Sequence, residues 1–165
     1  MNIREIKKTD AEKFALLIKE IEESSQYMLW EARERKVDIA KQAKEIDAIE
    51  KSENSTIFVA DHANELVGFL LAKGGSARRN KHSVYIVVGI LTHYRGKGVG
   101  TKLFKELEKW AKDHHIHRIE LTVVTENKAG LSLYKKQGFQ VEGTKRNSLF
   151  LNGEYVDEYY MSKLV

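Results

Sequence analysis

The sequence contains no cysteine and no proline among its 165 residues. Without cysteine the chain can form no disulfide, supply no thiolate ligand to a metal and use no cysteine nucleophile. Long apolar runs are also missing: none approaches the roughly 18 residues that a membrane-spanning helix needs. The first residues lack the apolar core of a signal peptide, so we expect a cytoplasmic protein. The missing proline carries no functional inference.

The composition is typical of a globular protein, with 42% hydrophobic and 32% charged residues. A chain of this length predicts one domain, residues 1–165, with a substantial core. No repeat, low-complexity tract or linker divides it. The formal net charge of +4 suits a polyanionic ligand, but by itself is too small to indicate nucleic-acid binding.

A strand-like run ends in three closely spaced glycines. Residues 84–90 are apolar and rich in β-branched side chains, Gly96, Gly98 and Gly100 follow, and an amphipathic helical pattern begins at Val99. Glycines let backbone N–H groups turn toward an anion, and a helix N-terminus adds its positive dipole. The spacing fits neither the dinucleotide fingerprint nor the nucleotide P-loop. These residues alone predict another phosphate-binding turn or simply a flexible turn.

Two motifs in this region resemble those of one known family. The pattern R-x-x-G-x-G, from Arg95 to Gly100, resembles the pyrophosphate loop of the GNAT N-acetyltransferases. Residues 127–139 resemble that family's N-x-x-A-x-x-L-Y-x-x-x-G-F, except that Gly130 stands where alanine is usual. The C-terminal half, around Trp110 and residues 157–161, is similar to the branch of ribosomal-protein-alanine, amino-acid and polyamine acetyltransferases.

The resemblance implies an acetyl-CoA-dependent enzyme that transfers acetyl directly to a primary amine. The acceptor stays open among a protein N-terminal amine, an amino acid, a polyamine and another small amine. Acetyl-CoA would be the co-substrate, with no metal. The implied architecture is the α/β (α+β) GNAT fold, a single domain with a mixed, mostly antiparallel sheet of six to seven strands flanked by about four helices.

The resemblance also assigns a donor site. It implies that the strand before the glycine loop and the loop itself hold coenzyme A, through Val88, Gly89, Ile90, Arg95, Gly96, Lys97, Gly98, Val99, Gly100 and Thr101. Gly89 would permit a bulge, and the N–H of Ile90 would meet the oxyanion. Asn127 would bond the pantetheine arm, although a helix N-cap explains it equally well. Tyr134 would protonate the leaving thiolate, the alternative being an aromatic packed on the sheet.

The acceptor side is less defined. In the resembled family the first two helices and their connection form one wall, which makes Tyr27, Trp30, Glu31 and Glu34 the candidates for acceptor binding. The charged run after Ala32 has a simpler interpretation as a solvated helix face. The general base stays open among Glu31, Glu34, His82, Tyr85 and Glu120, or a water chain.

Residue patterns predict the order of elements without the resemblance. Expected helices cover residues 9–23, 32–51 and 99–112, with a fourth in the stretch 127–139 and with Thr9 or Asp10 capping the first. Expected strands cover residues 3–7, 56–60, 66–72, 84–90 and 119–124, then one that includes residues 140–144 and 148–151, and a last one at 154–164. An Asn152–Gly153 turn should precede the last strand. That strand is expected at a sheet edge, where its apolar residues would make homodimerisation plausible.

Two other functions compete with the enzyme. One is a coenzyme A-binding regulatory module without turnover. The other is a basic RNA- or ribosome-associated protein, suggested by Arg78 and Arg79, whose loop is otherwise simply exposed. We expect no nucleic-acid partner and no membrane partner. The three histidines within residues 114–117 lack neighbouring ligands and predict a solvated linker rather than a metal site.

Overall fold

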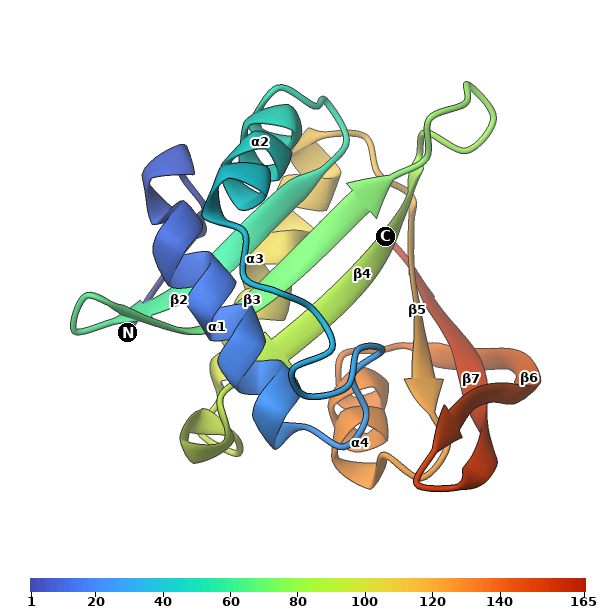
Figure 1. The fold of residues 1–165 in the computed structure, drawn as a ribbon. Helices are drawn as coiled ribbons and strands as arrows, with labels where there is room; N and C mark the ends of the chain where they lie inside the picture. The colour runs from blue at the N-terminus through green and yellow to red at the C-terminus, as the bar shows by residue number, and fades with distance from the viewer.

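The computed structural model describes residues 1–165 and contains one seven-stranded sheet in the order β1-β2-β3-β4-β5-β7-β6 (Figure 1). All neighbouring strands are antiparallel except β4 and β5. This confirms the expected mixed, mostly antiparallel sheet. The strands are β1 (Asn2–Glu5), β2 (Thr56–His62), β3 (Glu65–Gly74), β4 (Ser83–Ile90), β5 (Arg118–Val124), β6 (Gln140–Leu151) and β7 (Glu154–Leu164).

Four α-helices and two short 3-10 turns complete the fold. They are α1 (Ala11–Ser24), α2 (Ile39–Glu50), α3 (Val99–Asp113), α4 (Lys128–Lys136), η1 (Lys8–Asp10) and η2 (Thr92–Tyr94). None of the helices combines the length and the apolar character needed to cross a bilayer.

Two hydrophobic clusters lie on opposite faces of the sheet. Residues of α1 and α2 share one cluster with Phe69 of β3, whereas α3 shares the other with the next residue, Leu70. Successive strand residues point to opposite faces, so this alternation separates the two helix layers. Figure 1 shows α1 and α2 in front of the sheet and α3 behind it. Side chains of α4 pack on the α3 cluster.

The second helix is shorter than its charge pattern predicts. We expected residues 32–51, but α2 begins at Ile39. Arg33 has a φ of 65°, a left-handed value that a helix interior does not accept. The Asp38 carboxylate then accepts a hydrogen bond of 3.0 Å from the N–H of Lys41 and caps the helix. Glu34 therefore lies in the connection between α1 and α2 rather than on a helix.

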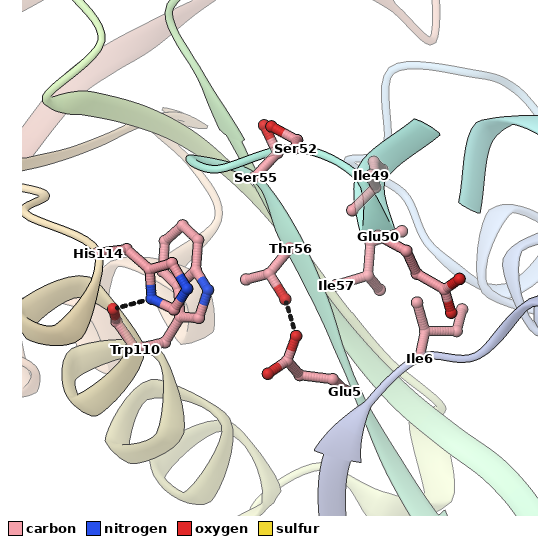
Figure 2. Close-up of a pocket in the computed structure, with 10 residues that line it drawn as sticks. All are labelled: Glu5, Ile6, Ile49, Glu50, Ser52, Ser55, Thr56, Ile57, Trp110 and His114. Carbon is pink, nitrogen blue, oxygen red and sulfur yellow. Dashed lines mark hydrogen bonds between the residues drawn. The ribbon is translucent and has the colours of Figure 1, made fainter. Parts of the chain in front are cut away.

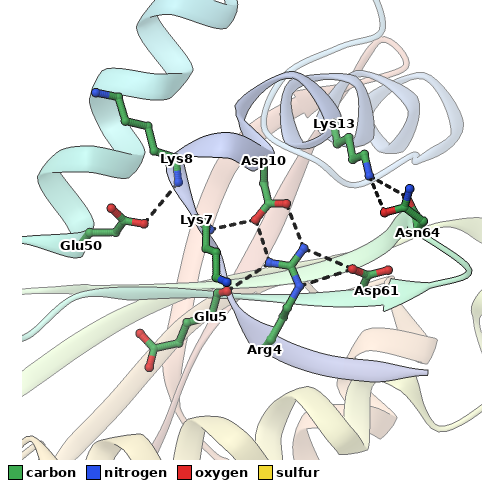
Figure 3. Close-up of polar contacts among 9 residues, drawn as sticks. All are labelled: Arg4, Glu5, Lys7, Lys8, Asp10, Lys13, Glu50, Asp61 and Asn64. Carbon is green, nitrogen blue, oxygen red and sulfur yellow. Dashed lines mark hydrogen bonds and ion pairs between the residues drawn. The ribbon is translucent and has the colours of Figure 1, made fainter.

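Asp10 does not cap the first helix as expected, because its carboxylate is already engaged. Arg4 donates to both of its oxygens, at 2.7 and 2.9 Å, and the N–H of Lys7 donates to it at 2.8 Å. Arg4 also bonds Asp61 at the end of β2. Figure 3 shows the guanidinium between the two carboxylates. This network joins β1 and the start of α1 to the β2–β3 hairpin.

We expect Asp10→Asn to lower the free energy of unfolding at pH 7 by about 2 kcal/mol, because it removes the charged partner of a half-buried arginine. The hydrogen bonds from Arg4 lower the pKa of Asp10. A lowered folded-state pKa contributes stability above the unfolded value of about 3.9, and this is lost as the pH falls through the folded value. Denaturant unfolding should therefore show the difference between wild type and variant shrinking as the pH falls below the unfolded value of about 3.9. Asp47→Asn, which removes an exposed pair with Lys51, should change stability little at either pH.

The last strand is not at a sheet edge. β7 pairs with β5 on one side and with β6 on the other, so β6 is the edge strand. The expected turn is present, with positive φ at Asn152 (51°) and Gly153 (80°). The β6–β7 register shifts between Lys145 and Leu149, and most β6 side chains are exposed. An apolar C-terminal edge therefore cannot support homodimerisation.

Candidate active site

The two parallel strands separate after three residues. Ser83–Tyr85 of β4 pairs with Arg118–Glu120 of β5, and beyond these residues β4 pairs only with β3 while β5 pairs only with β7. The far half of β4 contains the expected donor residues Val88, Gly89 and Ile90. Its backbone groups on the β5 side have no strand partner, so they are available to an extended ligand.

Gly89 has a packing role that the sequence did not indicate. A Cβ at this position would lie 2.6 Å from Cε1 of Phe69 and 3.0 Å from Cδ1 of Ile21. The Phe69–Gly89 register continues without a shift along β3 and β4. The bulge that we expected glycine to permit is therefore absent from this pairing, and the glycine makes room for a core phenylalanine.

The glycine loop lies between β4 and α3. Gly96 and Gly98 have φ values of 70° and 81°, and Gly98 is the N-cap of α3. A Cβ on either would meet nothing within 4 Å, so the space above the loop is open. The first helical hydrogen bond of α3 runs from Lys102 N–H to the carbonyl of Gly98. The N–H groups of the residues between, Val99, Gly100 and Thr101, are left without partners in the helix and favour an anion.

Charged side chains flank this loop. The Arg95 Nε donates to the carbonyl of Ile90 at 3.2 Å, which ties the loop to the end of β4. The Lys97 ammonium lies 5.6 Å from the centre of the Tyr94 ring, a cation–π distance. Each of these cations therefore has a contact with a residue that precedes the loop.

Gly100 differs from the other two glycines because it is buried. A Cβ there would lie 2.9 Å from Cδ2 of Leu133 and 3.5 Å from Cδ1 of Ile90. Its absent side chain lets α4 approach the start of α3. The third glycine of the motif thus contributes packing as well as a backbone N–H.

Asn127 is the N-cap of α4. Its Oδ1 accepts a hydrogen bond of 3.0 Å from the N–H of Gly130, which establishes the helix-cap alternative. A Cβ on Gly130 would lie 2.7 Å from Nδ2 of Asn127, so the departure from alanine gives the cap more room. The two hydrogens on Nδ2 remain available to a ligand.

The Tyr134 ring packs edge-on against Phe104 and Phe139, with ring centres 6.1 Å away in both cases. Burial, together with the nearby Tyr85 phenol, raises the pKa of Tyr134 to about 12. No hydrogen bond from a protein group contributes to that shift. The side chain is thus an aromatic in the core, as the structural alternative predicted, and also a protonated hydroxyl at neutral pH.

A second tyrosine lies where the strands part. The Tyr85 hydroxyl is 2.7 Å from Oγ1 of Thr122, two residues beyond the last β4–β5 pair, and Tyr85 is 40% exposed. Thr122 was missed by the sequence analysis. The sequence indicates only that Thr122 lies two residues after Glu120 on a strand, so the two side chains share a face of the sheet. It does not predict the contact with Tyr85.

The acceptor candidates lie in the connection between α1 and α2. Trp30 is 40% exposed, with the guanidinium of Arg35 5.0 Å from its ring centre. The Glu34 carboxylate accepts from the N–H of Glu31 at 3.1 Å. Tyr27 is half-buried. None of these four candidates forms a hydrogen bond or an ion pair with the glycine loop or with α4, so their acceptor role remains a prediction.

One ion pair that holds this connection was not predicted. Arg35 bonds Glu22, whose side chain is only 6% exposed, near the end of α1. Helical spacing places Glu22 one turn after Ile18, on the side of α1 that packs on the core, but the sequence does not identify Arg35 as its partner. Met28 packs on the cluster that contains α1 and α2.

The five candidates for the general base occupy different places. His82 precedes β4, and its ring is 6.5 Å from that of His117. Glu120 is opposite Tyr85 in the register, but its carboxylate is 2.9 Å from Nε of Arg118. Tyr85 lies at the strand separation with no charged partner.

A separate small cavity lies beside the first residues of β2, Thr56 and Ile57 (Figure 2). Thr56 donates to Glu5 there at 3.1 Å, and the His114 ring stacks on Trp110. The enclosed volume of about 100 Å³ is too small for coenzyme A. A ligand of that size therefore cannot occupy this cavity.

Comparisons with known proteins agree with this geometry. A sequence model described as the acetyltransferase (GNAT) family matches residues 17–139, well over half of the chain. The L-amino acid N-acetyltransferase AaaT of Escherichia coli K12 is 33% identical over 104 residues, which cover 61% of this chain and 62% of that protein. The match thus spans less than two thirds of that relative.

Solved structures share the fold along nearly the whole chain. A GNAT acetyltransferase from Streptococcus pneumoniae superposes with a TM-score of 0.95 at 24% identity, covering 99% of this chain and 98% of that one. Salmonella typhimurium yncA, solved with its cofactor acetyl-CoA, has a TM-score of 0.87 at 20% identity, with 99% and 92% covered.

Proposed function

This chain belongs to the acetyltransferase (GNAT) family, and from that membership we propose that it transfers acetyl from acetyl-CoA directly to a primary amine. The single observation that best supports the proposal is the separation of β4 from β5 beside an open glycine loop. An extended donor fits there, with its pyrophosphate on the N–H groups that begin α3 and its pantetheine along Val88–Ile90.

The chemistry needs a donor for the oxyanion, an acid for the thiolate and a base for the amine, and the first two have candidates. The acceptor nitrogen, delivered neutral, attacks the thioester carbonyl carbon, and the N–H of Ile90 is our candidate for the oxyanion. The C–S bond then breaks, and the Tyr134 hydroxyl gives its proton to the departing thiolate. The acceptor's lost proton passes to solvent or a base. Because no cysteine is present, transfer occurs in a ternary complex rather than through a cysteinyl enzyme.

We propose Tyr85 as the side chain that orients the acceptor nitrogen. Its hydroxyl is fixed by Thr122, is half-exposed, and lies close enough to Tyr134 to affect that residue's pKa. The amine would thus approach between two phenols.

Tyr85→Phe should lower kcat/KM for the amine roughly 10-fold, the effect of one hydrogen bond worth about 1.4 kcal/mol. Acetyl-CoA affinity should stay unchanged. Steady-state kinetics with each substrate varied would separate the two parameters, and Tyr155→Phe, an exposed tyrosine in the β6–β7 hairpin, is the control. Equal kcat/KM values for Tyr85→Phe and wild type would remove Tyr85 from the acceptor site.

The acceptor is assigned only as a class. The relative named an L-amino acid N-acetyltransferase supports free amino acids as the first compounds to assay, followed by peptides with free N-termini and polyamines. Tyr27, Trp30, Glu31 and Glu34 are our proposed acceptor-side residues.

Calorimetric titration of acetyl-CoA tests the donor site, and release of free thiol with each amine tests turnover. We expect saturable one-to-one binding and an amine-dependent thiol signal. Binding without thiol release from any amine would favour a regulatory module that holds coenzyme A. Absence of binding to the folded protein would contradict the proposal.

A further inference from the structure

The net positive charge of this protein comes from one segment. Residues 66–105 contain no aspartate or glutamate but carry eight lysines and arginines, whereas the whole chain has a net charge of only +4. The rest of the chain is therefore net acidic. The eight cations are Lys73, Arg78, Arg79, Lys81, Arg95, Lys97, Lys102 and Lys105.

These cations form two groups at opposite ends of β4. The last four lie in the glycine loop and on α3, where the proposed donor pyrophosphate accounts for them. The first four lie in or beside the connection from β3 to β4, which we call the basic tip (Lys73, Arg78, Arg79 and Lys81). Eight residues of β4 place the groups about 25 Å apart. Figure 1 shows this connection projecting from the sheet at the end away from the glycine loop.

Hydrogen bonds hold the basic tip in one conformation. Asn54 donates from Nδ2 to the carbonyls of Gly75 and Lys81, at 2.9 and 3.0 Å. The Asn80 side chain accepts from the N–H of Ala77 at 2.9 Å, and its own N–H bonds the Ala77 carbonyl. A ligand would therefore meet cations on a preformed loop, which lowers the entropic cost of binding.

The cations of the basic tip have no partners in the protein. Arg4, Arg35 and Arg118 each pair with a carboxylate, but no residue of the basic tip is in an ion pair. Residues 78–82 are all exposed. The exposed rings of His82 and His117 lie 6.5 Å apart beside the tip and offer flat surfaces next to the charges.

We propose that the basic tip binds single-stranded RNA through its phosphate backbone, at a site separate from the donor groove. Four unpaired cations along a narrow loop match a row of phosphates, and the two imidazole rings provide faces on which bases stack. An acidic protein segment would use the charges but not the rings. This inference does not depend on the proposed acetyl transfer.

The test is fluorescence anisotropy of a labelled oligouridine at increasing salt. Four phosphate contacts predict a slope of log K against log salt of about −2.8, equivalent to roughly 50-fold weaker binding between about 50 and 200 mM salt. In Arg78→Ala/Arg79→Ala the slope should fall to about −1.4, and the same salt change should cost roughly 7-fold. The denaturant unfolding curve of this variant should match that of wild type, which shows that it folds.

Arg95→Ala/Lys97→Ala is the matched control, since it removes the same charge from the other end of β4. It should weaken acetyl-CoA binding and leave the RNA slope near the wild-type value. The proposal is overturned if oligouridine does not bind, if the tip variant keeps the full slope, or if the control loses RNA instead. It is also overturned if poly-glutamate displaces the RNA at equal charge concentration, which would indicate an acidic protein partner.

Discussion

Gly98→Asp is expected to weaken acetyl-CoA binding roughly 10- to 100-fold. A carboxylate about 5 Å from the pyrophosphate costs on the order of 1–3 kcal/mol, depending on the effective dielectric constant. It would also compete for the N–H groups at the start of α3 that the ligand needs. Calorimetric titration of wild type and variant measures the change directly.

Gly98→Asn is the control for this experiment. Asparagine has nearly the same shape as aspartate, and both tolerate the left-handed backbone conformation (φ of 81°) better than other side chains do. No protein atom lies within 4 Å of the added Cβ, so neither variant should clash. We expect the neutral variant to lose only a few-fold in affinity. If the two variants bind acetyl-CoA equally well, the pyrophosphate does not sit on this loop.

Tyr134→Phe is expected to lower kcat by about 100-fold or more while leaving acetyl-CoA affinity unchanged, because general acid catalysis typically contributes 10²–10⁴-fold. The remaining ring still packs on Phe104 and Phe139. Single-turnover kinetics with the identified amine separate the chemical step from product release. A kcat equal to that of wild type would show that another group protonates the thiolate.

The free energy of unfolding at alkaline pH provides an independent check on the Tyr134 variant. The raised pKa of Tyr134, about 12, means that the folded state keeps this proton when the unfolded chain, with a tyrosine pKa of about 10, has lost it. Stability from this group is thus lost as the pH rises from about 10 to about 12. Tyr134→Phe lacks that loss, so its unfolding free energy should fall less steeply over the same interval.

The sequence predicted the glycine turn and the helix start after it, because the determinants of both are local. Left-handed turns favour glycine at Gly96 and Gly98, and a helix start leaves free N–H groups, so six consecutive residues were enough to predict the local backbone geometry. The order of elements followed in the same way from apolar periodicity and the Asn152–Gly153 turn. Even the misplaced start of α2 traces to local features, since Asp38 is a better cap than any residue near Ala32.

Contacts between residues far apart in the chain could not be predicted from the sequence. The need for glycine at Gly89 comes from Phe69 on another strand, and that at Gly100 comes from Leu133 on a helix thirty-three residues later. Nothing near Glu22 indicates that Arg35 will bury it. The position of β7 between β5 and β6 likewise depends on strand order, which alternation alone does not encode.

The separation of β4 from β5 makes the sheet a bipartite structure. Strands β1–β4 and strands β5–β7 share only three register pairs, supplemented by the Tyr85–Thr122 bond and by α3, whose core cluster includes side chains from both halves. A molecule that lies between β4 and β5 and forms hydrogen bonds to both would connect the two parts of the sheet. Its binding free energy would then add to the contacts between the two halves. The free energy of unfolding of the sheet would therefore increase with the fraction of protein that has the ligand bound.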